Sequence, residues 1–159
     1  MKTWLQFLRL FVLAGLASAN CLAQDITVRV LDVRNGQALS NGTVRVQFHV
    51  PLVSELQTLE GKTGSDGIAK FRLPEPMPPK IAVQVTNENP RLYPCYSLLL
   101  QETQTVVHDG FLSRCSKPQQ KCYCTFSKQV SQIQTKPGEL VLLVRPFTAW
   151  EKFLSHVWE

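Results

Sequence analysis

The chain has 159 residues, enough for one domain with a substantial core. Its 17 basic and 12 acidic residues give a formal net charge of +5, and the basic residues are scattered rather than gathered in a run. This distribution excludes the concentrated positive surface of a nucleic-acid-binding protein, so no nucleic-acid partner is expected.

Residues 1–23 have the layout of a secretory signal peptide. Two basic residues flank the start of an apolar segment, residues 10–17, which small residues follow. The apolar segment is too short for a comfortable membrane span. Small residues at suitable spacing allow cleavage after Ala19 or after Ala23. Removal of residues 1–23 lowers the formal net charge from +5 to +3, because this segment contains two basic residues and no acidic residue.

Cys21 allows a second interpretation, which is lipid attachment at a bacterial lipobox. That motif requires a small residue before the cysteine, and Asn20 occupies this place. Ordinary cleavage is therefore preferred, and it predicts a secreted or periplasmic protein.

Alternating apolar and polar residues after residue 24 predict a series of short β-strands. Residues 139–145 differ because they are apolar on both faces, which requires cover on both sides. Asn-Gly and Asp-Gly pairs supply tight turns between strands. Short strands separated by such turns favour an antiparallel β-sandwich. The predicted strands are residues 25–32, 43–50, 56–62, 68–73, 81–85 and 139–145.

Residues 61–76, GKTGSDGIAKFRLPEP, contain a turn, an alternating run and a proline-rich stop. Asp66 can brace the turn through its carboxylate, and Gly67 accepts a positive φ. We therefore assign Thr63 and Asp66 to the sharp reversal of the chain and not to a reactive loop.

The strand pattern stops after residue 87. Residues 98–108 fit a short helix closed by Gly110. Residues 116–136 are polar and rich in Gln, Ser and Lys. We therefore interpret residues 88–137 as an insertion that contains cysteines, with a long polar part on the surface.

The last segment, residues 147–159, is predicted to form an amphipathic helix. Thr148 and Glu151 match a capping box, in which each side chain accepts a hydrogen bond from a free amide at the helix start. The preferred interpretation is that this helix packs on the sandwich and covers the two-faced last strand. The alternative is contact with a membrane surface or a partner protein. The apolar side chains form one stripe at helical spacing: Trp150, Phe153, Leu154, Val157 and Trp158.

Cleavage after Ala23 leaves four cysteines, and an even number in an exported chain indicates disulfides with three possible connectivities. A bond between Cys122 and Cys124 would be strained, and pairing of Cys95 with Cys115 is preferred, with the other two free or exchanged into this set. A metal site formed by Cys115, Cys122 and Cys124 is the alternative. It lacks a nearby histidine and a CxxC spacing.

The order of strands and turns carries a family resemblance. The V-x-V-x-D pattern of Val28–Asp32 leads to an Asn-Gly turn and then to SNGTVRVQ. Thr63–Phe71 reads T-x-x-D-G-x-A-x-F, Leu-Pro follows, and Ile81–Val85 reads I-x-V-x-V. This order resembles the carboxypeptidase regulatory-like domains. The ending TKPGELVLLVRPFTAWEKFL is similar to that of their bacterial secreted single-domain members.

The resemblance covers residues 25–87. It implies a transthyretin-like (prealbumin-like) Greek-key β-sandwich of about seven strands, within the group of carbohydrate-binding-like folds. We expect this sandwich to occupy residues 24–146. The shared motifs are structural, so they imply little about function. In the peptidases the sandwich accompanies a separate zinc domain, of which this sequence shows no sign.

Candidate catalytic groups are dispersed. His49 falls on the outward face of its strand, His108 near the end of the predicted helix, and His156 in the tail. The acidic residues show no repeated spacing, and no nucleophile stands beside a base. The chain is therefore not expected to be an enzyme, and no metal or cofactor is predicted.

The predicted function is that of a non-catalytic secreted or cell-envelope module for binding or structure, with an envelope protein or a glycan as its partner. A carbohydrate-binding module is the alternative, since aromatic faces can stack on sugars. An accessory subunit of a small hydrolase is the third. The aromatic candidates for ligand contact in the predicted loops and insertion are Tyr93, Tyr96, Phe111 and Tyr123.

Overall fold

The computed structural model describes residues 24–50, 55–87, 92–95, 99–113 and 124–151, and it describes only the backbone at positions 93, 94 and 99. The predicted signal peptide with Cys21 and the residues after position 151 lie outside this part of the chain. The predictions for Tyr96, Cys115, Cys122 and Tyr123 also fall outside it.

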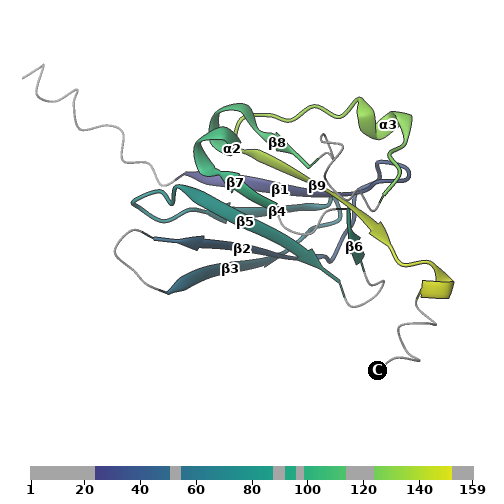
Figure 1. Cartoon of the computed structure of the whole chain (residues 1–159), viewed down its shortest axis with the longest axis horizontal. Coiled ribbons are helices and arrows are strands. Elements are labelled where there is room, and N and C mark those ends of the chain that lie inside the picture. Colours follow the sequence, from purple (N-terminus) through teal and green to yellow (C-terminus); the bar gives the residue numbers. More distant parts are fainter. Residues whose placement is uncertain (1–23, 51–54, 88–91, 96–98, 114–123, 152–159) are drawn as a thin grey trace, which may run out of the picture.

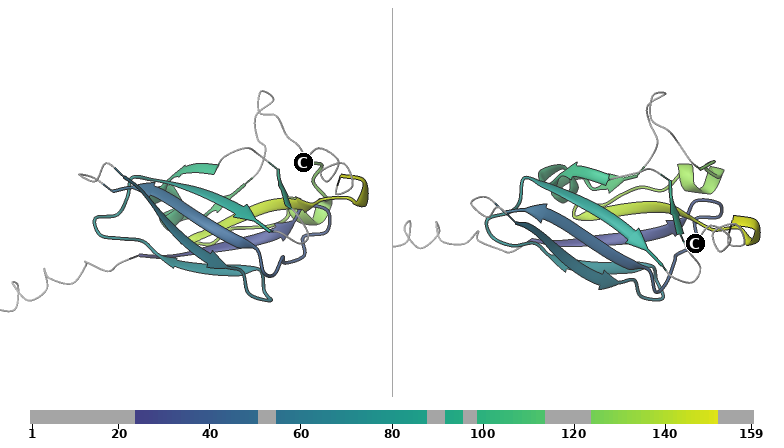
Figure 2. Two further views of the ribbon diagram at one scale, coloured as in Figure 1. Left: turned by 90° about the horizontal axis from the view of Figure 1, so that it is seen from below. Right: turned by 60° about the horizontal axis from the view of Figure 1, so that its bottom comes forward.

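The chain is mainly β, and its strands form two stacked sheets (Figure 1, Figure 2). The elements are β1 (Asp25–Asp32), β2 (Thr43–His49), β3 (Leu56–Lys62), β4 (Ile68–Arg72), β5 (Lys80–Thr86), β6 (Leu92–Pro94), β7 (Leu99–Glu102), α2 (Thr103–Asp109), β8 (Phe111–Leu112), α3 (Lys128–Ser131) and β9 (Glu139–Pro146). Sheet A has the order β4-β1-β9-β6, with β8 also paired to β9, and sheet B has the order β3-β2-β5-β7.

The main core lies between the two sheets. All six predicted strands are present. The side chains expected on the inward faces of β1, β2, β4 and β5 are buried, so the period-two prediction is confirmed for these strands, whereas Val50, which follows β2, and Leu59 of β3 are only partly buried. Burial of each such side chain contributes about 1.5–3 kcal/mol. The core residues include Ile26, Val28, Val30, Val44, Val46, Phe48, Ala69, Phe71, Ile81, Val83, Val85, Leu140, Leu142 and Val144.

The prediction of a purely antiparallel sandwich is wrong for sheet A. Strand β9 pairs with β1 in parallel, from Thr27 opposite Glu139 to Asp32 opposite Val144, and β8 also pairs with β9 in parallel. Sheet A is therefore mixed, whereas sheet B is antiparallel throughout. The side chains of a strand alternate between faces in both kinds of pairing, so the sequence pattern cannot distinguish them.

The prediction of a helix over residues 98–108 is wrong in its first half. Leu99–Glu102 forms β7, which pairs with β5, and only Thr103–Asp109 is helical. Gly110 ends α2 as expected: its φ is 73°, and a Cβ atom there would overlap the Lys136 carbonyl. Within the described ranges, no helix has the length and apolar character needed to cross a membrane.

Residues from the expected insertion complete the edge of β9. Strand β8 pairs beside Leu140 and Val141, and β6 pairs beside Val144, Arg145 and Pro146. Ser113 fills the interval, since its amide donates to the Val141 carbonyl at 2.9 Å and its Oγ accepts from the Leu143 amide at 2.8 Å. The region that the sequence separates from the sandwich therefore supplies strands to both sheets.

The outer face of sheet A carries a second apolar cluster. Leu31, Val33, Val141 and Leu143 lie on this face and are buried. Their cover comes from residues 124–133, which the sequence assigned to a polar surface segment. Val130 of α3 is fully buried there, with Cys124, Phe126 and Ile133 packed around it. This cover explains why β9 is apolar on both faces, as the sequence required.

Candidate functional site

The segment at residues 61–76 has a structural role. The buried Oγ1 of Thr63 donates to the Leu39 carbonyl at 2.7 Å and accepts from the Gly42 amide at 2.9 Å. The Asp66 carboxylate accepts from the Ile68 amide at 3.0 Å. Gly67 has a φ of 72°, and a Cβ atom there would lie 2.8 Å from the Val30 carbonyl oxygen. These contacts agree with the assignment of this segment to chain reversal.

A disulfide joins Cys95 to Cys124, with a Cα–Cα distance of 5.3 Å. The preferred pairing of Cys95 with Cys115 is therefore wrong. Cys95 follows β6, is fully buried, and its amide donates to the Leu143 carbonyl at 3.4 Å. Cys124 opens the segment that covers the outer face of sheet A. The bond thus attaches the cover to the edge of β9, a pairing that depends on the path of the chain and not on cysteine spacing.

The cysteine metal site loses one ligand, because Cys124 is in the disulfide. Among the residues with described positions, no group of three His, Cys, Asp or Glu side chains could hold a metal ion. His49 is exposed at the end of β2 and His108 lies in the last turn of α2, so the two described histidines belong to different elements.

The aromatic candidates for glycan contact are not gathered by the described structure. Phe111 of β8 is partly buried and packs against the main core. Tyr93 is paired with Arg145 in the β6–β9 ladder, and only its backbone is described. The glycan interpretation therefore remains a prediction from sequence, and Phe111 is assigned to packing.

The start of the tail is attached to β9 by polar contacts. The Glu151 amide donates to Thr148 Oγ1 at 3.3 Å, and the Thr148 amide donates to Glu151 Oε2 at 2.8 Å, so the predicted capping box is confirmed. Arg145 adds two hydrogen bonds to the same carboxylate, at 2.5 and 2.8 Å. Hydrogen bonds from Arg145 and from the Thr148 amide lower the pKa of Glu151 to about 2.

Trp150 is the first residue of the apolar stripe, and it is 66% exposed. It lies in the helical turn that begins at residue 149 and ends the described chain. Most of the Trp150 side chain is therefore exposed, and residues 124–133 supply the described cover of β9. The other stripe residues, Phe153, Leu154, Val157 and Trp158, lie outside the described residues.

A second ion pair lies at the same end of sheet A. Asp32 is 4% exposed and accepts four hydrogen bonds from Arg34, including one from the Arg34 amide at 2.9 Å. Burial alone would raise the pKa of Asp32, but the Arg34 contacts and the charge of Arg145 outweigh it and leave the pKa below its usual value. Arg145 could not be selected from the sequence, because its six-residue spacing from Glu151 fits no regular contact within a helix.

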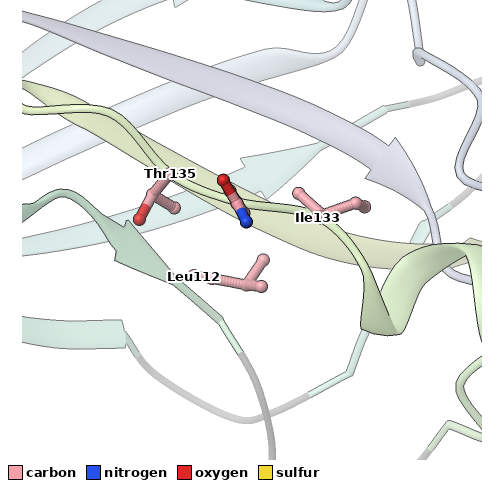
Figure 3. Close-up of a pocket in the computed structure, with 4 residues that line it drawn as sticks. Leu112, Ile133 and Thr135 are labelled. Atoms are coloured by element: carbon pink, nitrogen blue, oxygen red, sulfur yellow. The ribbon is translucent and has the colours of Figure 1, made fainter.

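An open depression of about 410 Å³ lies between β8 and the segment after α3 (Figure 3). Its lining is Leu112, Ile133, Gln134 and Thr135. The Thr135 hydroxyl donates to the Asp109 carbonyl at 3.4 Å, and the Gln134 carbonyl accepts from Arg29 at 3.4 Å. The lining contains no ionisable group, so it offers neither a catalytic base nor a charged ligand site.

Comparison of the sequence with protein-family models and with curated proteins finds no match.

Proposed function

We propose that this chain is an exported, non-catalytic β-sandwich that binds a protein of the cell envelope through its C-terminal segment. The proposed sandwich is of the carboxypeptidase regulatory-like, transthyretin-like type with Greek-key connections. Support comes from the two stacked sheets, from the turn at Asp66-Gly67, and from a chain that passes repeatedly between the sheets.

The exposure of Trp150 carries the proposal. The capping contacts and the Arg145–Glu151 ion pair hold the start of the tail at the end of β9, while Trp150 stays 66% exposed. Tryptophan is enriched among the residues that dominate binding energy in protein interfaces. A large aromatic side chain held in this way on an ordered support is suited to a partner's apolar pocket.

The charge of the tail favours a protein partner over a membrane surface. Helices that lie on membranes usually carry several Lys or Arg residues on their polar face. Residues 148–159 contain a single lysine, Lys152, against two glutamates. Their apolar stripe therefore lacks the positive charge that attracts anionic lipids.

Export and the absence of catalysis are parts of the same proposal. The Cys95–Cys124 disulfide supports an oxidising compartment, where such bonds persist. The placement of His49 and His108 on separate elements supports a non-catalytic role. Thr63 and Asp66, the most conspicuous polar residues of the turn segment, are occupied with backbone contacts.

A pull-down from the native envelope tests the proposal. The bait is the processed chain, residues 24–159, compared with a chain ending at residue 147 and with Trp150→Ala. We expect mass spectrometry to identify an envelope protein that the truncated chain loses. Trp150→Ala should retain this protein at least tenfold less well, because a central aromatic hot spot contributes about 2 kcal/mol or more. Leu100→Ala is the matched control, since Leu100 is also exposed, at 52%, but lies on β7.

The other outcomes each have a clear meaning. Retention of the same partner by the truncated chain would contradict the proposal. If the truncated chain has a lower melting temperature than the intact chain but retains the partner equally well, the tail has a packing role. Binding of the intact chain, but not the truncated one, to vesicles of phosphatidylglycerol and phosphatidylethanolamine would replace the protein partner with a membrane surface.

A further inference from the structure

Strand β3 forms a long, regular edge of sheet B. It lies at the border of the molecule in Figure 1, and all seven of its residues pair with β2 in one uninterrupted register. Five of the seven residues are exposed. Sheet edges of this kind are normally blocked by a bulge, a proline, charged side chains or a covering element. Strand β3 contains neither a bulge nor a proline, and its charged residues, Glu60 and Lys62, lie in its last three positions. The opposite edge, β7, has four residues and runs directly into α2.

The free backbone groups of β3 belong to alternate residues. The Thr63 amide donates to the Gly42 carbonyl at 2.9 Å, and this pair continues the β2–β3 register. Bonded and non-bonded pairs alternate along an antiparallel ladder, so the odd-numbered residues of β3 bond to β2. Within the described part of the chain, no backbone hydrogen bond beyond the β2 ladder involves residues 56–62. The residues with outward N–H and C=O groups are Leu56, Thr58, Glu60 and Lys62.

We propose that two copies of this chain associate through β3, as an antiparallel pair with its twofold axis at Leu59. In this register Thr58 lies opposite Glu60 of the second copy, and Leu56 lies opposite Lys62 of the second copy. All of these residues have outward backbone groups, so the interface gains about eight backbone hydrogen bonds. The two copies of sheet B then form one continuous sheet.

Strand length and charge favour this register, because a twofold axis at Leu59 pairs all seven residues of β3 in both copies. It places no charged side chain opposite a like charge, whereas an axis at Glu60 would place two carboxylates opposite each other. Glu60 also pairs with Arg45 of its own copy at 2.7 Å, and both side chains are about half exposed. Leu56, which is 51% exposed, gains cover from the aliphatic part of Lys62 of the second copy.

A second copy fits this edge better than an unrelated extended segment. The Leu59 side chain is partly buried against the main core, and in the twofold arrangement it meets its own equivalent at the axis. Twofold interfaces of this isologous kind use one surface patch twice and close after two copies. A second β3 therefore matches the first in strand length, in the positions of its outward backbone groups and in the side chains at the axis.

Substitutions at Thr58 test the register directly. Thr58→Glu places one carboxylate opposite each Glu60 across the interface, whereas Thr58→Lys places one ammonium group there, and Thr58→Ala is the neutral control. Light scattering and sedimentation velocity on residues 24–159 measure the dimer Kd. We expect Thr58→Glu to raise Kd roughly tenfold and Thr58→Lys to lower it by a similar factor. The difference should shrink at high salt.

Thr58→Pro provides a second test. The Thr58 amide is one of the outward groups, so its removal spares the β2 ladder, and prolines are tolerated on sheet edges. We expect a monomer with an unchanged far-UV circular dichroism spectrum. If this variant does not fold, the Glu and Lys variants decide the question. A wild-type chain that stays monomeric up to about 1 mM would overturn the proposal. A dimer of equal Kd in the Glu and Lys variants would also overturn it.

Discussion

The buried hydroxyl of Thr63 connects two turns that are far apart in sequence. It donates to the Leu39 carbonyl and accepts from the Gly42 amide, so it satisfies two backbone groups of the segment that enters β2. Its own amide and carbonyl bond to Gly42 and Asn41. A buried polar group without a hydrogen-bond partner costs the full free energy of its desolvation. The Thr63 hydroxyl therefore contributes more to the stability of the fold than a typical surface hydrogen bond.

Thr63→Val should therefore destabilise the chain while preserving its shape. We expect a loss of about 1–3 kcal/mol in the free energy of unfolding, because the Leu39 carbonyl and the Gly42 amide lose a partner. Urea denaturation measures this change. Thr63→Ser, which retains the hydroxyl, should lose less than about 1 kcal/mol, and Thr58→Val on the exposed edge should change stability by at most about 0.5 kcal/mol. Equal losses in Thr63→Val and Thr63→Ser would assign the effect to packing instead.

At the scale of elements, β9 organises sheet A. One of its edges pairs with β1, and the other meets β8, Ser113, Cys95 and β6 in turn. Its inward side chains enter the main core, and its outward side chains enter the second cluster. Residues 124–133 must therefore stay packed on sheet A for the outward apolar side chains of β9 to remain buried.

The disulfide should contribute measurably to this attachment. The bond joins residues with a sequence separation of 29. The conformational entropy that such a bond removes from the unfolded chain corresponds to a stabilisation of about 3–4 kcal/mol. The paired substitution Cys95→Ser with Cys124→Ser should lower the free energy of unfolding by a comparable amount, again measured in urea. Addition of a reductant should have little effect on the doubly substituted chain. A strong further loss would show that another disulfide carries the stability.

Peptide mapping separates the observed pairing from the one that the sequence favoured. Trypsin places Cys95 in the peptide 92–114, Cys115 in 115–121, and Cys122 with Cys124 in 122–128. We expect 92–114 to be linked to 122–128 in the unreduced protein, and Cys122→Ser to preserve this link. A link from 92–114 to 115–121 would contradict the structure.

The attachment of the tail should persist into strong acid. The pKa of Glu151 is lowered to about 2, so its contribution is complete above about pH 4.5 and is lost as the pH falls through about 2. The ion pair is partly exposed and contributes less than about 1 kcal/mol, so a local probe is needed. In residues 24–159 with Trp158→Phe, Trp150 is the sole tryptophan. Its emission should change near pH 2, and in Glu151→Gln no such change should occur.

Far-UV circular dichroism of the same samples provides the control for that titration, because the sheets must remain folded at the pH of the change. A change centred near pH 4.5 would show that the Arg145–Glu151 contact does not form.

The whole molecule is a stack of two sheets and a partial third layer. Strands β1 and β9 lie side by side, with the main core on one face and the residues 124–133 on part of the other. Amides of dilute, monomeric protein should exchange with solvent most slowly in these two strands, since their exposure requires both apolar clusters to open. Hydrogen-exchange mass spectrometry should find faster exchange in β3, an edge strand with five exposed residues, than in β1 or β9. Faster exchange in β9 than in β3 would contradict this layered arrangement.

Local chemistry made the separate strands and turns predictable. Apolar alternation identified β1, β2, β4 and β5, the Asp66-Gly67 pair identified a turn, and Thr148 with Glu151 identified a helix start. The candidate site was less predictable. Trp150 was selected from helical spacing, but its exposure and its support by Arg145 depend on where the chain runs after β9.

The amino-acid sequence by itself determined which segments are extended, which side chains of each strand point inward, and where the chain turns, because these properties depend on neighbours a few residues away. Only the tertiary structure decided that β9 runs parallel to β1, that Leu99–Glu102 is a strand, that Cys124 is the partner of Cys95, and that residues 124–133 cover sheet A. Each of these outcomes depends on contacts between segments far apart in the chain. Their free energy comes from burying both surfaces together, and neither segment carries that information alone.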